Sequence, residues 1–207
     1  SRLDDYAGEF KEVFNDEEIH FDYVVKALAA FVRSLTSFNS SFDRYAYFNE
    51  DEALSDSAIR GMDLFFSEKL ECFHCHGGFN FTQSSKHALQ KLDLISFHNT
   101  GLYNEDGKGS YANEDQGLAD ITFDPNHTGK FRAPTLRNVM LSAPYMHDGS
   151  IATMSDVIDF YAAGGRGEGI KNPFKSPFIQ GFDITDEEKQ DLLNFLESLT
   201  DYEFVGL

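Results

Sequence analysis

Apolar residues recur at steps of three and four in several segments, the spacing that places them on one face of an α-helix. The first such segment runs from about Glu18 to Leu35, and a loop over residues 37–43 follows it. A second helix, with a broad apolar face, is predicted from Ser55 to about Glu68. Residues 1–17 are polar with scattered aromatic side chains, so we expect a partly ordered lead-in there.

The middle of the chain shows no sustained periodicity. Residues 77–133 are rich in Gly, Asn, Asp and Ser, which predicts long loops. Loops of this length are uncommon in compact domains unless they have a function, and wrapping a large cofactor is such a function. A short helix is predicted near Thr135–Leu141. The pattern therefore indicates a mainly α fold whose loops pack around a bound group.

Two helices in the last third of the chain carry clear boundary signals. Thr153 is suited to cap the first of them, and Gly164-Gly165 is suited to end it. Thr185 and Glu188 form a capping-box pattern at the start of the second. The apolar stripe of the first helix is Met154, Val157, Ile158 and Tyr161, and that of the second is Leu192, Phe195, Leu196 and Leu199.

The two cysteines of the chain stand in the run Cys72-Phe73-His74-Cys75-His76, a C-x-x-C-H motif. In this motif the thiols form thioether bonds with the two vinyl groups of haem, and the histidine binds the iron. A tight turn sets the sulfurs at the spacing of the vinyl groups and brings the imidazole of His76 under the ring. The motif thus predicts one covalent haem c and, with it, redox chemistry.

Two other interpretations of the cysteine pair are weaker. A zinc site needs two further nitrogen or sulfur ligands, but there is no second cysteine pair, and His74 or His87 would be at an unusual spacing. A thiol redox motif is expected in a βαβ setting, and no strand is predicted before Cys72. The histidine directly after Cys75 therefore favours haem c.

The residue pattern alone does not identify the ligand on the other side of the iron. The candidates are Met140, Met146, His147, Met154 and Tyr161, with His87, His98 and His127 as outsiders. A thioether would favour ferrous iron and raise the reduction potential, whereas a phenolate favours ferric or higher states and lowers it. The helical stripe places both Met154 and Tyr161 on the inward face.

Composition and net charge restrict the classes of partner that the protein is expected to bind. The chain has 207 residues, enough for one or two domains, and a formal net charge of −18. This charge argues against nucleic acid and anionic membranes as partners and suits a small basic redox protein. No apolar run approaches the roughly 20 residues of a membrane span. Because haem c is attached outside the cytoplasm, we expect a periplasmic or otherwise exported protein.

Three blocks of the sequence resemble the bacterial di-haem cytochrome c peroxidase and MauG family. They are residues 26–35 with Phe42-Asp43-Arg44-Tyr45, the haem motif with Gly61-Met62-Asp63-Leu64-Phe65 before it, and residues 131–139 running into 143–149. The third block, which includes Tyr145-Met146-His147-Asp148-Gly149, is long and specific. The resemblance extends over nearly the whole chain from about residue 6.

The resemblance implies a mainly α, cytochrome c-like haem domain with long loops wrapping the haem. Family members have two haem domains: peroxide reacts at the N-terminal haem, and the C-terminal haem exchanges electrons with it. Residues 1–50 match the end of the N-terminal domain with its linker, and residues 51–207 match the C-terminal haem domain. The expected function is therefore the electron-exchanging part of a peroxidase-type oxidoreductase. A non-catalytic electron-transfer cytochrome is the alternative.

Only one C-x-x-C-H motif is present, so a companion domain or chain would have to supply the peroxidatic haem. The resemblance also bears on the upper iron ligand. The peroxidases place a methionine near the end of the helix after the His-Asp-Gly block, and MauG-like members have a tyrosine there. The matching residue is Tyr161, which we expect to be the second axial ligand opposite His76, with Met154 as the fallback.

The resemblance suggests roles for residues around the haem. Arg132 and Arg137 are candidate partners of the haem propionates, although a surface salt bridge is the alternative for each. His147 is expected to be buried and hydrogen-bonded rather than a ligand. In the family, backbone carbonyls that correspond to Ser142 and Pro144 bind an interdomain Ca²⁺. Its partner asparagine would lie in the N-terminal half, so the sequence does not favour calcium here.

Overall fold

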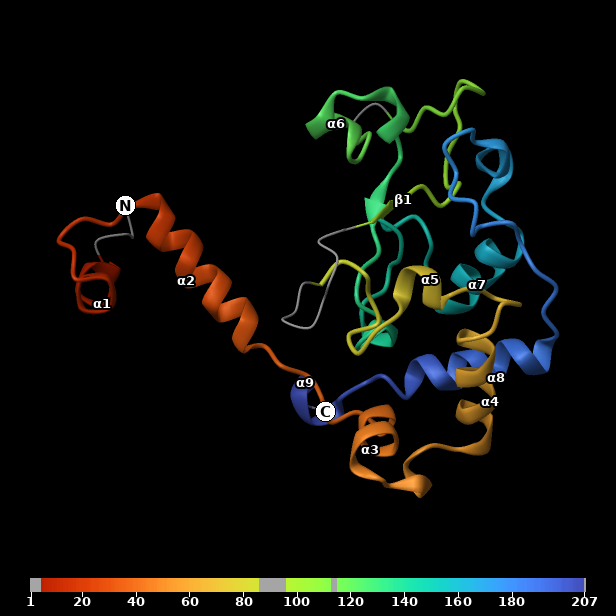
Figure 1. Ribbon diagram of the computed structural model, residues 1–207, viewed down its shortest axis with the longest axis horizontal. Coiled ribbons are helices and arrows are strands. Elements are labelled where there is room, and N and C mark those ends of the chain that lie inside the picture. Colours follow the sequence, from red (N-terminus) through yellow and green to blue (C-terminus); the bar gives the residue numbers. More distant parts are fainter. Residues whose placement is uncertain (1–4, 86–95, 113–114, 207) are drawn as a thin grey trace. The chain divides into compact units, whose positions relative to one another are not determined.

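The computed structural model describes residues 5–85, 96–112 and 115–206 (Figure 1). The described parts are mainly helical, which confirms the predicted fold class. The chain divides into two compact units, Ser1–Phe38 and Asn39–Leu207. No helix in these described ranges combines the length and the apolar character that crossing a bilayer requires.

The first unit contains two helices, α1 (Ala7–Phe14) and α2 (Phe21–Ser34). Helix α2 agrees with the predicted helix, but α1 replaces the expected partly ordered lead-in. Two contacts join α1 to α2: the ring of Phe14 stacks on that of Tyr23 at 4.2 Å, and the Tyr23 hydroxyl donates to Asp16 at 2.9 Å. The aromatic residues that looked scattered in the sequence therefore make a small hairpin.

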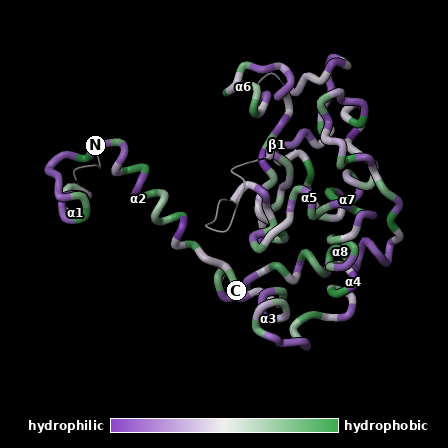
Figure 2. The backbone as a smooth tube through the Cα atoms, viewed as in Figure 1, coloured by the Kyte–Doolittle hydropathy of each residue, from purple (hydrophilic) through white to green (hydrophobic). Residues whose placement is uncertain are grey.

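One face of α2 is apolar and exposed. No residue of α2 is buried, and Phe21 and Leu28 are 83% and 60% exposed. Figure 2 shows hydrophobic and hydrophilic positions alternating along this helix. The α2 apolar face consists of Phe21, Val25, Leu28, Phe31, Val32 and Leu35. Exposed apolar surfaces of this kind are typical of interaction sites.

The second unit holds short helices, 3-10 turns and one two-stranded ribbon. Its elements are α3 (Ser41–Phe48), η2 (Asp51–Ala53), α4 (Asp56–Phe65), α5 (Phe73–His76), β1 (Phe97–His98), α6 (Ala119–Thr122), η3 (Pro125–His127), β2 (Phe131–Arg132), η4 (Val139–Leu141), α7 (Met154–Ala162), η5 (Gly167–Lys171), α8 (Asp186–Glu197) and α9 (Tyr202–Val205). Strands β1 and β2 pair in antiparallel fashion.

The main core forms where α4 crosses α8 (Figure 1). The crossing is close because α4 presents Gly61 to the backbone of α8 at Asp191. Around it lies an apolar cluster that includes Phe65, Phe81 and Phe195, all at most 2% exposed. The predicted caps of α7 and α8 are present at Thr153 and Thr185, and Thr185 forms the expected capping box with Glu188. Ser55, where the second helix was expected to start, caps α4.

Two predicted boundaries are wrong. The loop expected over 37–43 ends early, because a capping box between Ser40 and Asp43 starts α3 inside it. The helix expected at Thr135–Leu141 is only the 3-10 turn η4. Asn138 takes a left-handed φ of 58° and its backbone N–H donates to Leu199 at 3.1 Å, so a regular helix cannot pass through this position.

Loops dominate the described parts of residues 77–133, as predicted, but β1 and β2 were missed. The strands are two residues long and have no alternating pattern to reveal them. Beside them lies a second apolar cluster built on Leu102, Tyr111 and Phe160, against which Phe131 and Tyr161 pack. The ribbon and Tyr161, which the family resemblance assigns to the iron, therefore pack on the same apolar cluster.

We expect Gly61→Ala to destabilise the protein strongly. A Cβ atom at this position would overlap the backbone carbonyl group of Asp191, which cannot move without separating α4 from α8. Overpacking of a close-packed core costs roughly 1–3 kcal/mol or more. Urea unfolding measures the change. The control is Asp63→Ala on the exposed side of the same helix, which should change the free energy of unfolding by less than about 0.5 kcal/mol.

Candidate haem site

The two cysteines lie at opposite ends of a single helical turn. Cys72 precedes α5 and Cys75 lies within it, and both thiols are free. The backbone N–H of His76 donates to the Cys72 carbonyl at 3.0 Å, so the turn also fixes the imidazole relative to the sulfurs. One turn thus presents two thiols and an imidazole together.

The thiols are not activated. Burial raises the pKa of Cys72 to about 12 and that of Cys75 to about 11. Redox-active C-x-x-C thiols have the opposite property, a lowered pKa that makes the thiolate available near neutral pH. The electrostatics of this site therefore do not suit a thiol–disulfide exchange centre.

The imidazole of His76 is held in one tautomer. Its Nδ1 lies 3.1 Å from the Pro134 carbonyl oxygen and 3.3 Å from that of Phe81. Because carbonyl oxygens only accept hydrogen bonds, Nδ1 carries the proton and Nε2 keeps its lone pair. Burial lowers the pKa of His76 to about 4, so the ring is neutral at neutral pH. An imidazole oriented through its other nitrogen is the usual form of a metal-binding histidine.

Hydrogen bonds between two loops hold those carbonyl groups. The Thr82 hydroxyl donates to the Ala133 carbonyl at 2.6 Å, and the Thr135 hydroxyl donates to the Asn80 carbonyl at 2.6 Å. The loop after the motif is thus tied at two points to the segment that contains Pro134. The position of the His76 ring depends on both.

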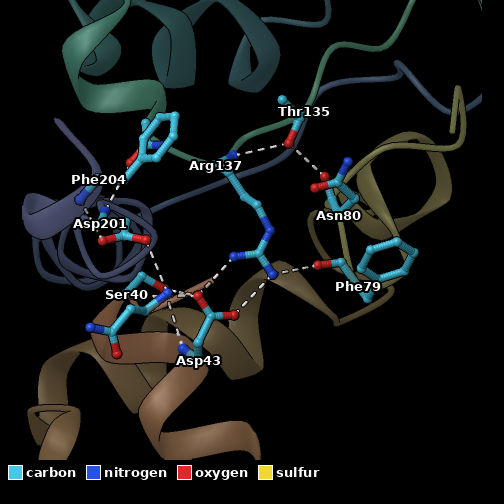
Figure 3. A network of polar contacts seen from close by, with 10 residues as sticks. Ser40, Asp43, Phe79, Asn80, Thr135, Arg137, Asp201 and Phe204 are labelled. Carbon is cyan, nitrogen blue, oxygen red and sulfur yellow. Dashed lines mark hydrogen bonds and ion pairs between the residues drawn. The ribbon is translucent and has the colours of Figure 1, made fainter. Parts of the chain in front are cut away.

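A buried ion pair supports the same two loops (Figure 3). Arg137 makes a bidentate pair with Asp43 at 2.8 and 2.9 Å, and its Nη2 also donates to the Phe79 carbonyl at 2.7 Å. Arg137 and Asp43 are 8% and 1% exposed. The Ser40 hydroxyl donates to the same carboxylate at 2.7 Å. This pair links α3 to the loop after the haem motif.

Tyr161, near the end of α7, lies close to the cysteine pair. Burial, followed by the influence of the Cys75 and Cys72 thiols, raises the pKa of its hydroxyl well above the usual range. The side chain is nevertheless only half-buried, and it lines a cavity of about 220 Å³ together with Glu71 and Phe182. Its surface therefore faces a hollow rather than packed protein. Met154, seven residues earlier, is 7% exposed within the main core.

The other candidate ligands are placed as follows. Met140 and Met146 are half-buried against the two apolar clusters. The expectation that His147 is buried is wrong: its ring is exposed and stacks on Phe131 at 3.9 Å. His127 contacts the Thr122 hydroxyl at 2.9 Å. His98 lies on β1, and His87 is outside the described residues.

The two arginines predicted to contact propionates have other partners. Arg137 is engaged by Asp43, and the exposed Arg132 lies over the ring of Phe97 at 5.1 Å. Their contact with a propionate stays a prediction. Ser142 and Pro144 are exposed on the loop after η4, and a calcium site there also stays a prediction.

A zinc centre at the cysteines finds no support in the part of the chain that the structure describes. The one group of three metal-ligating side chains there is Glu68, Glu71 and His74, and it contains neither cysteine. His74 instead stacks on Phe178 at 4.5 Å. The donor set at the cysteines is thus two thiols, one oriented imidazole and the half-buried phenol of Tyr161 nearby.

Comparisons with known proteins agree with this donor set. Residues 1–53 match the family model described as di-haem cytochrome c peroxidase. The cytochrome-c peroxidase IdrP1 of Pseudomonas sp. (strain SCT) is 34% identical over 95% of this chain and 54% of its own length. The methylamine utilization protein MauG of Methylophilus methylotrophus is 32% identical over 96% of this chain and 52% of its own length.

The chain belongs to the di-haem cytochrome c peroxidase and MauG family. It spans about half the length of the curated family members that it matches. A solved structure of a MauG-like protein associated with microbial copper homeostasis has 45% identity, a TM-score of 0.88, and coverage of 97% of this chain and 60% of its own. The di-haem peroxidase BthA from Burkholderia thailandensis E264, at 24% identity, a TM-score of 0.59, and coverage of 82% and 48%, shares the fold.

Membership in this family implies haem c and a haem-based redox function, and the residues described above fit that cofactor. Both thiols are free, and the neutral imidazole of His76 keeps the lone pair on Nε2 that iron ligation needs. Sequence reasoning missed two residues that complete the site. Pro134 acts through its backbone carbonyl, which no side-chain pattern reveals. Asp43 lies in a Ser-x-x-Asp capping pattern that could have been found.

We expect Arg137→Met to destabilise the protein by about 3–5 kcal/mol, since it leaves the buried Asp43 carboxylate without its cation. Urea unfolding is the measurement. The matched control is Lys171→Met, which removes one partner of the exposed pair with Glu168 and should cost at most about 1 kcal/mol. Equal, small changes in the two variants would contradict a supporting role for the Arg137–Asp43 pair.

Proposed function

We propose that this chain is the electron-exchanging haem c part of a di-haem peroxidase or MauG-type oxidoreductase. The observation that carries the proposal is the arrangement around His76. A neutral imidazole with its Nδ1–H held by the Pro134 carbonyl lies beside two free thiols, and the half-buried phenol of Tyr161 is close to those thiols.

Each residue has a separate task in this proposal. Haem c supplies reversible one-electron chemistry when it is bound. Cys72 and Cys75 would fasten it through thioether bonds, and His76 would bind the iron through Nε2. Tyr161 would supply a second iron ligand through its hydroxyl oxygen, with Met154 as the fallback. Burial raises the pKa of the Tyr161 hydroxyl, which favours the protonated phenol in the protein without haem.

Two axial ligands would leave no open position for peroxide at this iron, so the unit would relay electrons. The proposal therefore includes a companion domain or chain that carries the peroxidatic haem. Residues 1–50 would be the end of that N-terminal domain with its linker, and 51–207 the C-terminal domain. The family match over residues 1–53 supports this division, and the exposed α2 apolar face supports a covering partner.

A small basic redox protein in the periplasm is the electron donor that the chemistry suits best. The chain carries a net charge of −18, which would speed its encounter with a positively charged protein. The alternative function is an electron-transfer cytochrome without catalysis, which the filled upper position would also fit. Turnover of hydrogen peroxide with and without a companion domain distinguishes the two.

The first test is covalent haem attachment. Intact mass should show one haem on the wild-type polypeptide, and Cys72→Ser with Cys75→Ser should abolish attachment because no thioether can then form. His74→Ala is the matched control inside the same motif and should keep the haem. The proposal would be ruled out by a wild-type protein that is produced together with a haem c maturation system and still has two titratable thiols.

The second test concerns Tyr161. We expect Tyr161→Phe to change the optical and EPR spectra of the ferric protein and to open the iron to cyanide, since a phenyl ring cannot ligate. The control is Tyr145→Phe, whose hydroxyl donates to the Val139 carbonyl at 3.1 Å and should leave both spectra unchanged. Unchanged spectra in Tyr161→Phe would remove tyrosinate ligation, and Met154→Leu would then be the variant to examine.

A further inference from the structure

His98 on β1 has a buried nitrogen atom without a partner in the described structure. Its Nε2 is shielded from solvent, and no hydrogen-bonding atom of residues 5–85, 96–112 or 115–206 reaches it. Burying a polar group without a hydrogen bond is costly, so such an atom points to a partner that is not one of these protein atoms. The Ser84 hydroxyl, on the loop after the haem motif, has the same property.

The strand register shows which way His98 faces. His98 pairs with Phe131, and Phe97 pairs with Arg132. Paired residues of an antiparallel ribbon share a face, and successive residues alternate between faces. His98 is therefore on the face of Phe131, whose ring packs on the apolar cluster that also contacts Tyr161. Arg132 is on the opposite, exposed face.

The same segment leads to the iron-binding histidine. Pro134, three residues after Phe131, accepts the hydrogen bond from His76 Nδ1 at 3.1 Å. His98 is also close enough to His76 for its charge to contribute to lowering the pKa of His76. The charge of Lys130 likewise contributes to lowering the pKa of His98. Ser84 is beside this segment too, because the Thr82 hydroxyl accepts from the Ser84 backbone N–H and donates to the Ala133 carbonyl across the loops.

We propose that His98 donates a hydrogen bond from Nε2 to a propionate carboxylate of the bound haem, with Ser84 as a second donor. The inference rests on the proposed function, since it requires haem c at Cys72 and Cys75. It assigns to His98 the part that the sequence suggested for Arg132 and Arg137. One of those arginines faces outward and the other is held by Asp43.

The proposal has an electronic consequence. A donor on the propionate stabilises its negative charge, which in turn reduces the stabilisation that this charge gives to ferric iron. Removing the donor should therefore lower the reduction potential of the haem. It should also change the vibrational modes of the propionate carboxylate, which report on its hydrogen bonds directly and do not depend on turnover.

The test compares three variants of the haem-loaded protein. His98→Ala removes the donor, His98→Gln keeps an N–H donor, and His127→Ala is the control at another histidine, one whose Nδ1 contacts Thr122. Resonance Raman spectra with propionate-labelled haem and potentiometric titrations are the measurements. We expect shifted carboxylate modes and a lower midpoint potential in His98→Ala, partial restoration in His98→Gln, and neither change in His127→Ala.

Failure of the inference differs from failure of the proposed function. Carboxylate modes and a midpoint potential that are unchanged in a haem-loaded His98→Ala would overturn the assignment of His98 while leaving the haem site intact. A wild-type protein without haem would overturn the function itself. Should His98→Ala not retain haem, His98→Leu, which fills more of the space but has no donor, and Ser84→Ala carry the same comparison, and unshifted carboxylate modes in both would equally reject the assignment.

Discussion

The hydrogen bond from His76 Nδ1 to the Pro134 carbonyl is the contact on which the rest of the site depends. It fixes the tautomer, the ring plane and the free lone pair of the imidazole together. A single helical turn places the ring near the sulfurs but does not fix its orientation. The orientation is fixed by a backbone oxygen nearly sixty residues further along the chain. The loop after the motif and the segment that contains Pro134 must therefore be held in place for His76 to be oriented for ligation.

The buried ion pair of Asp43 and Arg137 holds these two loops in place. The guanidinium group bonds both the carboxylate that caps α3 and the carbonyl of Phe79. Buried ion pairs give little net stability compared with apolar packing, but losing one partner is costly. Their best-attested use is to specify one arrangement over others. Here the arrangement specified is the contact between α3, the loop after the motif and the segment that contains Pro134 (Figure 3).

Local signals in the sequence predicted local structure well. The caps at Thr153 and Thr185 and the helical stripes of α4, α7 and α8 could be identified because each depends on residues within one or two turns. The failures have a non-local cause. Asn138 leaves the helical conformation while its N–H bonds the carbonyl of Leu199, far along the chain, and no pattern near Thr135 reports that contact.

The candidate site likewise has a part that local sequence signals predicted and a part that depends on non-local contacts. The C-x-x-C-H motif predicts its own chemistry, but the closeness of Tyr161 to the thiols is a tertiary contact that no local pattern reports. Residue pattern alone could not separate Tyr161 from the other candidates, and only the family resemblance favoured it. His98 was considered as an iron ligand. Its buried, unpartnered nitrogen became visible only in three dimensions, because its surroundings come from β2 rather than from its neighbours in sequence.

The high pKa values of the cysteines bear on the order of events during biosynthesis. Burial raises the pKa of both thiols, to about 12 for Cys72 and about 11 for Cys75, so little of the nucleophilic thiolate forms in the folded protein at neutral pH. In an unfolded chain the same cysteines would be exposed and more acidic. For a porphyrin joined to this motif, we therefore expect attachment to be easier before tertiary closure, with folding then proceeding around a cofactor already in place.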